Sequence, residues 1–319
     1  MNDRRSAIAR ALLTSEGATL SGEMLAGKLG VTRVAVAKHI ATLRELGFDI
    51  ESLHRSGYRL RSIPDFALPE TVGPLVTDSL WCRFEGSRTT QSTNDDAKRL
   101  ARAGAEEGTV VVASYQKAGR GRLGREWSSP EGGAYFSGIL RPVMSPADAS
   151  QLSLVVALGA ASGLETLGLH ARIKWPNDLI LDGRKVGGIL LEMSAEADSV
   201  EWLVFGMGIN VRSARGMHPH AVCVCDLLPD ARPPMVAAAA LDGIASAYRR
   251  FMSYGFASLQ PGYEQRDVLA GLPVTVRDAK GGVLADGIAG GIDALGRLLV
   301  GDRVVTAGEV TLRSPQVDG

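Results

Sequence analysis

The stretch S-Y-Q-K-A-G-R-G-R-L-G-R-E-W, at residues 114–127, decides how the rest of the chain is interpreted. It follows an apolar, β-branched run at residues 109–113, which is long enough for one buried strand and comes directly after Gly108. The glycines and arginines therefore lie after the strand, in a loop. Glycine lets a backbone approach a ligand closely, and arginine offers forked donors to phosphate or carboxylate oxygens. The sequence predicts an anion-binding loop.

Three arginines, Arg120, Arg122 and Arg125, lie close together in this loop and repel one another when no anion is present. We expect the loop to be mobile when empty and ordered when filled, because ordering costs about 1–2 kcal/mol of backbone entropy per residue. Two other interpretations stay open at this point. The loop fits an exposed basic turn, or a Gly-Arg segment that binds RNA.

The whole chain has the composition of an ordinary folded protein. Its 319 residues suggest two or three domains at roughly 100–200 residues each. Hydrophobic residues make up 45% and charged residues 22%, and no uninterrupted apolar run reaches the length of about 18 residues that spans a bilayer. The first residues, M-N-D-R-R-S, do not resemble a signal peptide. We expect a cytoplasmic protein without a membrane partner.

Cysteine usage predicts neither a disulfide framework nor a metal centre. The chain has 3 cysteines, Cys82, Cys223 and Cys225. The last two form a Cys-x-Cys pair near His218 and His220, but no second pair stands at a zinc-type spacing. The sequence therefore favours an ordinary strand or loop here, and no metal-ligating residue is predicted.

Residues 1–63 have the pattern of a winged helix-turn-helix domain that binds DNA. Helical periodicity runs over residues 3–13, 21–29 and 33–46, followed by two short strands around a turn at 54–57. Residues 1–62 hold 10 Lys or Arg and 6 Asp or Glu, a net charge of +4. Basic side chains of the third helix and the wing are the expected contacts with bases and phosphates. These candidates are Arg33, Lys38, His39, Arg44 and Arg55. The alternative is a helical bundle used for protein contacts.

The rest of the chain predicts an α+β protein of two further domains after a linker. Residues 67–268 alternate between strand-like and helical segments, which indicates a mixed, mainly antiparallel sheet with helices on one face. Residues 270–319 contain short strands broken by glycines, typical of a small β-barrel domain. Because this last domain has no cluster of catalytic residue types, we expect it to serve in docking or stability.

Asp182-Gly183 predicts a two-residue hairpin turn that brings two charged side chains together. With that turn, Lys185 pairs with Ile180, and Asp178 lies one diagonal step away on the same face, about 7–8 Å between backbones. The plain alternative is a surface ion pair, usually worth under about 1 kcal/mol. The neighbouring Trp175 and Pro176 are unusual for an exposed hairpin and favour a binding role.

Two further stretches carry polar groups suited to a ligand. Ser92-Thr93-Asn94 precedes an amphipathic helix, so one hydroxyl is expected to cap the helix while the others face a ligand. Gly206-Met207-Gly208-Ile209-Asn210 closes a predicted strand with small residues and an amide able to read a nucleobase edge.

Three stretches together resemble biotin protein ligases of the kind that also repress a biotin operon: residues 119–127, residues 174–192 and residues 206–210. The resemblance covers nearly the whole chain, including the winged helix and the last domain. It implies that biotin and ATP form biotinyl-AMP, with Mg²⁺ accompanying ATP. It also implies transfer of biotin to a lysine of a carboxylase's biotin carboxyl carrier domain, and a homodimer loaded with biotinyl-AMP that binds operator DNA and represses biotin synthesis genes.

The resemblance assigns roles to individual residues. The catalytic candidates are Lys185 and Arg122, as donors to the α-phosphate, and Asp178, which would position or deprotonate the amine. The biotin-binding candidates are Ser92, Thr93, Asn94, Gln116, Arg120, Gly121, Arg122, Lys185, Gly187 and Gly188. The candidates for binding ATP and the adenylate are Arg122, Arg125, Trp127, Lys185 and Asn210. Within these sets, Trp127 would stack on adenine and Asn210 would bond the base.

The chain departs from the family pattern at two places. Leu123 stands where relatives often have a basic residue, and no aromatic residue follows Asn210 until Tyr248. Both departures bear on how well the adenylate is retained. Two alternative functions stay open: a lipoate-type ligase of the same superfamily, and a ligand-sensing regulator without catalytic activity.

Overall fold

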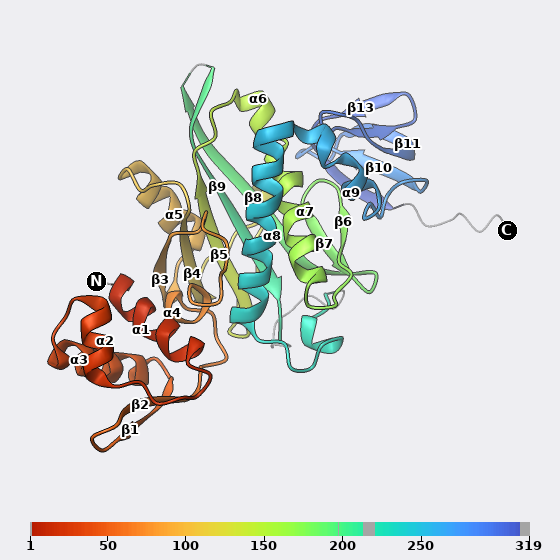
Figure 1. Ribbon diagram of the computed structural model, residues 1–319. Coiled ribbons are helices and arrows are strands. Elements are labelled where there is room, and N and C mark those ends of the chain that lie inside the picture. Colours follow the sequence, from red (N-terminus) through yellow and green to blue (C-terminus); the bar gives the residue numbers. More distant parts are fainter. Residues whose placement is uncertain (1, 197, 213–220, 313–319) are drawn as a thin grey trace.

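The N-terminal part of the computed structural model, which describes residues 2–196, 198–212 and 221–312, is the expected winged helix (Figure 1). It comprises α1 (Asn2–Thr14), α2 (Gly22–Leu29), α3 (Arg33–Glu45) and the wing strands β1 (Asp49–Leu53) and β2 (Gly57–Ser62). The side chains of Ser21 and Thr32 accept hydrogen bonds from backbone amides of the helices that follow them, at 3.0 and 3.2 Å. These caps fix where α2 and α3 begin. The predicted apolar faces, including Ile8, Val36 and Ile40, form the core of this part.

A mixed sheet of seven strands forms the centre of the molecule, in the order β3-β4-β5-β9-β8-β7-β6. The strands are β3 (Arg83–Thr90), β4 (Thr109–Gln116), β5 (Gly133–Leu140), β6 (Arg172–Lys174), β7 (Asp178–Leu181), β8 (Arg184–Glu196) and β9 (Ser199–Asn210). Only β3 and β4 run parallel, and every other pair is antiparallel. The prediction of a mixed, mainly antiparallel sheet is confirmed.

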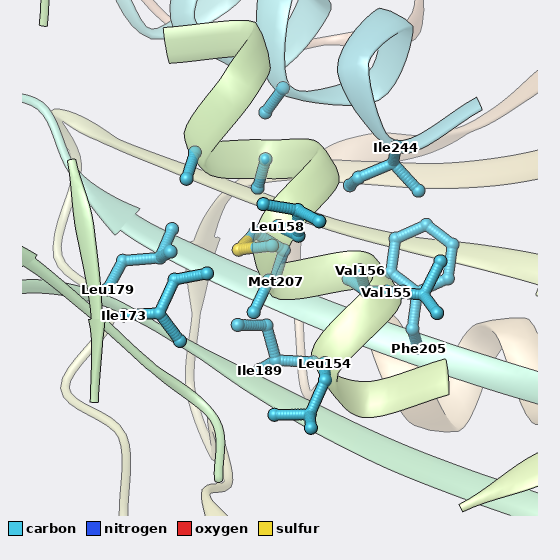
Figure 2. Close-up of a cluster of buried hydrophobic side chains, with 14 of the residues drawn as sticks. Leu154, Val155, Val156, Leu158, Ile173, Leu179, Ile189, Phe205, Met207 and Ile244 are labelled. Carbon is cyan, nitrogen blue, oxygen red and sulfur yellow. The ribbon is translucent and has the colours of Figure 1, made fainter. Parts of the chain in front are cut away.

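Helices cover both faces of this sheet, so the expectation of helices on one face was wrong. α7 (Leu152–Glu165) and α8 (Pro233–Tyr254) lie on one face, where Val155 and Leu158 pack toward Phe205 and Met207 (Figure 2). α5 (Thr93–Arg102) packs on the other face against a separate cluster that includes Trp202. Side chains alternate between the two faces of a strand, so both faces of β4, β5 and β9 present apolar groups.

The apolar helix α7 belongs to this core. Gly163 allows α7 to approach α8 closely, since a Cβ atom there would lie 2.0 Å from the Ala239 carbonyl oxygen. Together with the short α6 (Pro146–Ala149), it gives the one described stretch, Pro146–Glu165, with the length and apolarity of a membrane span. Because 72% of its most apolar window is buried inside the protein, the stretch is explained by packing against the sheet and α8.

The C-terminal part is a second antiparallel sheet that shares the core of the central part. Its strands are β10 (Pro273–Arg277), β11 (Val283–Ile292), β12 (Leu298–Val300), β13 (Arg303–Val305) and β14 (Glu309–Leu312), in the order β13-β12-β11-β10-β14. No pairing closes β13 on β14 within the described residues, so the structure shows an open sheet where the sequence predicted a barrel. The Trp175 indole donates a hydrogen bond to the Gly296 carbonyl at 3.1 Å and ties the two sheets together.

The winged helix is docked on the central part through α1 and the short α4 (Pro69–Val72) (Figure 1). Arg5 forms an ion pair of 2.9 Å with Glu70, whose side chain is nearly inaccessible to solvent. Arg10 donates a hydrogen bond of 2.6 Å to the Gly73 carbonyl. The remaining short helices are η1 (Arg122–Gly124), η2 (Val224–Asp226), η3 (Phe256–Ser258) and α9 (Gln260–Glu264).

Candidate functional site

A cavity of about 190 Å³ lies where the loop after β4, the start of α5, the β7–β8 hairpin and the start of β14 meet. It brings together most of the residues that the sequence predicted as ligand-binding or catalytic. The predicted residues in its wall are Ser92, Thr93, Asn94, Gln116, Arg120, Gly121, Arg122, Arg125, Trp127, Asp178, Lys185 and Gly188. Segments separated by two hundred residues of sequence thus form one pocket.

Gly187 and Asn210 are the two predicted residues that the structure does not place in this wall. Gly187 and Gly188 are adjacent on β8, so they face opposite sides of the sheet. A Cβ atom on Gly187 would lie 2.8 Å from the Gly208 carbonyl oxygen, within the ladder, whereas one on Gly188 would meet the Trp127 ring. Asn210 is buried at the end of β9, opposite Gly133.

Carboxylates from two different parts of the chain hold the two outer arginines of the loop. Arg120 pairs with Asp95 at the start of α5, and Arg125 makes two hydrogen bonds to Glu309 of β14. The hydrogen bonds from Arg125 hold the pKa of Glu309 below its usual value, so this carboxylate stays charged. The sequence indicated that the three arginines repel one another when no anion is present, and the structure supplies a carboxylate for two of them.

Arg122, between these two, has no ion pair in the described part of the chain. Its guanidinium lies 3.4 Å from the Asn177 side-chain oxygen and 3.5 Å from the Gly308 carbonyl, both neutral and both near the limit of a hydrogen bond. Burial lowers the pKa of Arg122, and the charges of Asp178 and Glu309 offset that effect in part. A half-buried cation with such weak partners suits an incoming anion.

The loop is also folded by its own backbone. The Gly121 amide donates to the Arg125 carbonyl at 2.8 Å, and the Trp127 amide donates to the Gly119 carbonyl at 2.9 Å. Arg120 and Glu126 form an isolated bridge across the loop. These bonds define the shape of the loop in the structure. The expected change from mobile to ordered on filling stays a prediction.

The β7–β8 hairpin has the predicted register next to its turn, but a bulge between Leu179 and Ile180 shifts the pairing by one residue, so that Asp178 lies opposite Gly188. Ile180 pairs with Lys185, and Asp182 and Gly183 of the turn both have positive φ. The Lys185 ammonium lies 2.7 Å from the Asp178 carboxylate, and both groups face the cavity. The pair is half-exposed, so its own contribution to stability is small. Its position in the wall distinguishes it from an ordinary surface ion pair.

Trp127 lies against the floor of the pocket. A Cβ atom on Gly208 would approach the indole nitrogen to 2.4 Å, so only glycine accommodates the ring in this position. The indole N–H is buried and has no hydrogen-bond acceptor in the described residues. The Lys185 ammonium lies 5.2 Å from the centre of the same ring. Trp127 therefore packs on β9 with its ring in the cavity wall and its N–H turned toward the sheet.

Neutral polar groups line the opposite end of the pocket. The Thr93 amide donates to the Gln116 side-chain oxygen at 2.8 Å, and the Thr93 hydroxyl lies 2.8 Å from the hydroxyl of Ser137, a buried residue of β5. Ser92 occupies the N-cap position of α5, but its side chain makes no capping bond. The expectation that one of these hydroxyls caps the helix was therefore wrong for Ser92.

The DNA-binding candidates occupy three different settings. Arg33, Lys38 and Arg55 are exposed on α3 and the wing. The Arg44 guanidinium is bound to the wing, with hydrogen bonds of 2.8 and 2.6 Å to the Ile50 carbonyl. His39 is half-buried, and burial followed by the nearby charges of α1 lowers its pKa. The first three are thus the groups best placed to reach a nucleic acid.

Among the described residues, no group of three or more His, Cys, Asp or Glu side chains is arranged to hold a metal ion. Cys223 is buried, and burial together with Cys225 and Asp226 raises the pKa of its thiol to about 11. A protonated thiol is a poor metal ligand. His218 and His220 lie outside the described residues.

Several residues of the wall were missed by sequence reasoning. Lys174, Trp175 and Asn177 line the cavity and lie within a motif already singled out, so the motif was the available signal. Gly308, Glu309 and Val310 also line it, although the C-terminal part was expected to have no such role. Nothing in the local sequence of β14 resembles a ligand-binding motif.

Comparison with known proteins places these features in context. Residues 86–210 match the biotin/lipoate A/B protein ligase family, and residues 4–59 match an HTH domain. The chain is similar to the bifunctional ligase/repressor BirA of Bacillus subtilis, 36% identical over 290 residues, which cover 88% of this chain and 89% of that protein. It is also 32% identical to the bifunctional ligase/repressor BirA of Escherichia coli over 99% of this chain and 100% of that protein. The biotin protein ligase from Aquifex aeolicus, solved in complex with biotin and ATP, aligns with a TM-score of 0.62 and 28% identity, covering 73% of this chain and 99% of that one.

Proposed function

The chain belongs to the biotin protein ligase family, and we propose that its pocket activates the carboxylate of biotin with ATP and passes the biotinyl group to a lysine of an acceptor protein. Like its relatives that are named ligase and repressor together, it joins a ligase pocket to a DNA-binding domain. The acceptor we propose is the biotin carboxyl carrier domain of a carboxylase.

The observation that carries this proposal is the unpaired Arg122 beside Lys185 in a wall that also holds Trp127. Arg122, which has only weak neutral partners among the described residues, and Lys185, whose ion pair with Asp178 is half-exposed, suit the phosphates of ATP, and the Trp127 ring suits the nucleotide base. The neutral hydroxyls and amides at the other end suit a ureido ring, which has both donors and acceptors. One pocket therefore has a place for each half of a biotinyl-adenylate.

In the first step, a biotin carboxylate oxygen bonds to the α-phosphorus of ATP, and diphosphate leaves with the electron pair of the broken P–O bond. Negative charge increases on the α-phosphoryl oxygens during this step. Lys185 and Arg122 donate hydrogen bonds to those oxygens. Because the Lys185 ammonium lies 2.7 Å from Asp178 in a half-exposed pair, it can turn from this carboxylate to the phosphoryl group at little cost, which leaves Asp178 without its counter-ion.

In the second step, the lysine amine of the acceptor attacks the acyl carbon of biotinyl-AMP, an amide bond forms, and AMP leaves. The amine must be neutral to attack. Once Lys185 has turned to the phosphate, the Asp178 carboxylate is free to accept a proton from the incoming ammonium or amine. The same carboxylate therefore serves as a counter-ion in the empty pocket and as a base in the loaded one.

Magnesium enters this reaction with ATP. The described residues do not form a site for a resident metal ion, because the one carboxylate on the β7–β8 hairpin that lines the cavity is already paired with Lys185. Magnesium typically keeps several water ligands and binds through substrate phosphates. We therefore assign no protein ligand to it.

Exchange of labelled diphosphate into ATP, with and without biotin, tests the first step. Biotin-dependent exchange is expected, together with transfer of biotin to a purified carrier domain. Lipoate offered in place of biotin should support neither reaction. Exchange that responds to lipoate and not to biotin would assign the chain to the other branch of the superfamily, and no exchange with either would leave a regulator without catalysis.

We also propose that the protein represses biotin synthesis genes as a homodimer loaded with biotinyl-AMP. A single winged helix makes few phosphate contacts, so stable binding needs two copies on paired half-sites. The adenylate strengthens DNA binding only if it favours the dimer. With these substrates and partners, the location we propose is the cytoplasm.

Titration of a palindromic operator with and without biotin plus ATP tests the regulatory role. Binding should be tighter with both present than with ATP alone, and should weaken as salt rises because phosphate contacts release counterions. Arg33→Ala in the full chain should weaken binding to the operator while leaving biotin transfer unchanged. If the adenylate has no effect on operator affinity, the winged helix is not controlled in this way.

A further inference from the structure

Behind the Thr93 hydroxyl, a chain of hydrogen bonds runs across the sheet to a carboxylate that no step above uses. The Ser137 hydroxyl lies 2.8 Å from the Thr93 hydroxyl and 2.6 Å from the side-chain oxygen of Asn94. The other end of the Asn94 amide donates to Glu192 of β8 at 2.9 Å. Thr93, Asn94 and Ser137 are all at least 96% buried, so water does not compete for their hydrogen bonds.

The Asn94 amide is fixed in one orientation. Its oxygen lies against β9, where a Cβ atom on Gly206 would approach it to 1.9 Å. A carboxylate only accepts hydrogen bonds, so the amide nitrogen must face Glu192 and the amide oxygen must face Ser137. Rotation of the amide by half a turn would place two acceptors, the amide oxygen and the carboxylate, 2.9 Å apart.

This orientation sets the direction of every proton along the chain. The Ser137 hydroxyl carries one proton, and its contact of 2.6 Å with the Asn94 oxygen needs that proton because the oxygen is an acceptor. The Thr93 hydroxyl has two acceptors within reach, Ser137 at 2.8 Å and the Gln116 side-chain oxygen at 3.1 Å, and the shorter contact needs the Thr93 proton because the Ser137 proton is already used. With its proton directed at Ser137, the Thr93 hydroxyl offers lone pairs to the pocket.

We propose that Glu192 is a positioning residue that makes the Thr93 hydroxyl an acceptor for an N–H group of the bound ligand. The inference rests on the proposed function, in which that N–H belongs to the ureido ring of biotin. It adds a specificity role for a carboxylate that does not touch the ligand. A ligand that presents an oxygen to Thr93, in place of the N–H, meets another acceptor and is rejected.

Lys98 balances the charge of this carboxylate. Its ammonium lies 2.6 Å from Glu192 and 3.1 Å from Asp95, and its side chain is 15% exposed. Asp95 in turn holds Arg120 of the loop. Lys98 therefore supports Glu192 electrostatically, while the direction of the hydrogen-bond chain depends on the acceptor that faces the Asn94 amide nitrogen. This difference separates a positioning role from a general role in stability.

The test compares biotin with its two cyclic carbamate analogues, in which one or the other ring N–H is replaced by oxygen. Wild type should reject at least one carbamate relative to biotin. In Glu192→Gln, the chain of hydrogen bonds can point in either direction, because the new amide both donates and accepts hydrogen bonds. The variant should therefore raise the KM for biotin roughly 10- to 100-fold at nearly unchanged kcat, and reduce the discrimination against that carbamate by a similar factor.

Two further variants make the result specific. Lys98→Met breaks the same ion pair and leaves the carboxylate in place, so it should keep the wild-type discrimination; equal loss in both variants would mean that the ion pair, and not the hydrogen-bond direction, matters. Glu196→Gln removes an exposed carboxylate from the same strand and should change nothing. If Glu192→Gln does not fold, Asn94→Ala breaks the chain one link nearer the pocket and must give the same loss.

A wild-type enzyme that ligates no biotin would overturn the proposed function itself. A wild type that ligates biotin, beside a Glu192→Gln variant with unchanged KM and discrimination, would overturn only the inference about Glu192.

Discussion

The two ends of the pocket are built in opposite ways. At the Thr93 end, buried neutral groups bond to one another in a closed network from α5, β4 and β5. At the loop end, exposed arginines bond to carboxylates of α5 and β14 that stand in for ligand anions. Buried networks are costly to disturb, whereas exposed ion pairs exchange at little cost. The Thr93 end, which is expected to select the ligand, is therefore rigid. At the loop end, which is expected to enclose the ligand, the arginines can exchange one anion for another.

The largest expected effect concerns a charged group at the exchangeable end. Lys185→Ala should lower the rate of adenylate formation by about 10²–10³-fold, because it removes a donor to the developing charge on the phosphoryl group. Single-turnover measurement of biotinyl-AMP formation checks this. Arg184→Ala, which alters the exposed neighbour on the same hairpin, is the control and should stay near wild type. A similar rate in both variants would mean that Lys185 has another role.

Arg122→Ala should separate binding from enclosure. Biotin should still bind, because the Thr93 end is intact, but biotinyl-AMP should leave roughly 10- to 100-fold faster because the phosphate loses one of its two charged donors. The released adenylate should label bystander proteins, which a blot for biotin detects. Lys117→Ala, at an exposed position earlier in the same loop and outside the cavity wall, is the matched control. Labelling of bystanders at the wild-type level would show that Arg122 does not enclose the intermediate.

The C-terminal part must be held firmly on the central part, since it supplies Glu309 to the loop. At this joint Asp267 is buried, with one carboxylate oxygen lacking a partner among the described residues. Burial raises its pKa, although hydrogen bonds from Leu269 and Ala270 oppose the shift. The folded state then binds this proton more tightly than the unfolded state, so the contribution to stability is present below the ordinary pKa and is lost as pH rises through the raised one.

Asp267→Asn should remove the loss of stability that ionisation of the buried Asp267 carboxyl causes as pH rises. The variant should be more stable than wild type at neutral pH, by about 1 kcal/mol, and the difference should shrink at low pH. Urea unfolding at several pH values measures it, with the exposed Asp302→Asn as the control. A variant that is less stable than wild type at neutral pH would show that the ionised carboxylate is needed at this joint.

The smallest expected effect concerns the outermost ion pair. Glu309→Gln frees Arg125, so the KM for ATP should fall, by no more than about fivefold because both groups are exposed. Glu131→Gln breaks a similar exposed pair with Arg88 away from the pocket and should leave the KM unchanged. A rise in the KM for ATP would mean that Glu309 helps to hold Arg125 in its binding position, and the two ends would then differ less than described.

Sequence reasoning identified the pocket where its residues are close in the chain. The Asp182-Gly183 turn determined the pairing of Lys185 with Ile180, because a two-residue turn allows one register. The glycines and arginines of residues 119–127 indicated an anion site, because few other functions need that mixture. In local patterns of this kind, residues that are close in the sequence determine the geometry by themselves.

What sequence reasoning missed depends on contacts between distant segments. Glu309 and Asp95 are ordinary acidic residues, and only the fold brings each to an arginine of the loop. The pattern of Ser92-Thr93-Asn94 favoured a helix cap, whereas the structure directs these side chains into the pocket and the hydrogen-bond network behind it. The helices were placed on one face because periodicity shows that a helix has an apolar side without showing which face of the sheet it covers.

The contribution of β14 to the pocket has a consequence for the order in which a ribosome makes the chain. The wall begins with Ser92 and ends with Val310, so every residue between them must be synthesised before the cavity can close. A nascent chain that has folded its winged helix and central sheet still lacks Glu309 and the backbone that faces Arg122. The reactive acyl-phosphate intermediate is thus expected to accumulate only on molecules whose synthesis has passed β14.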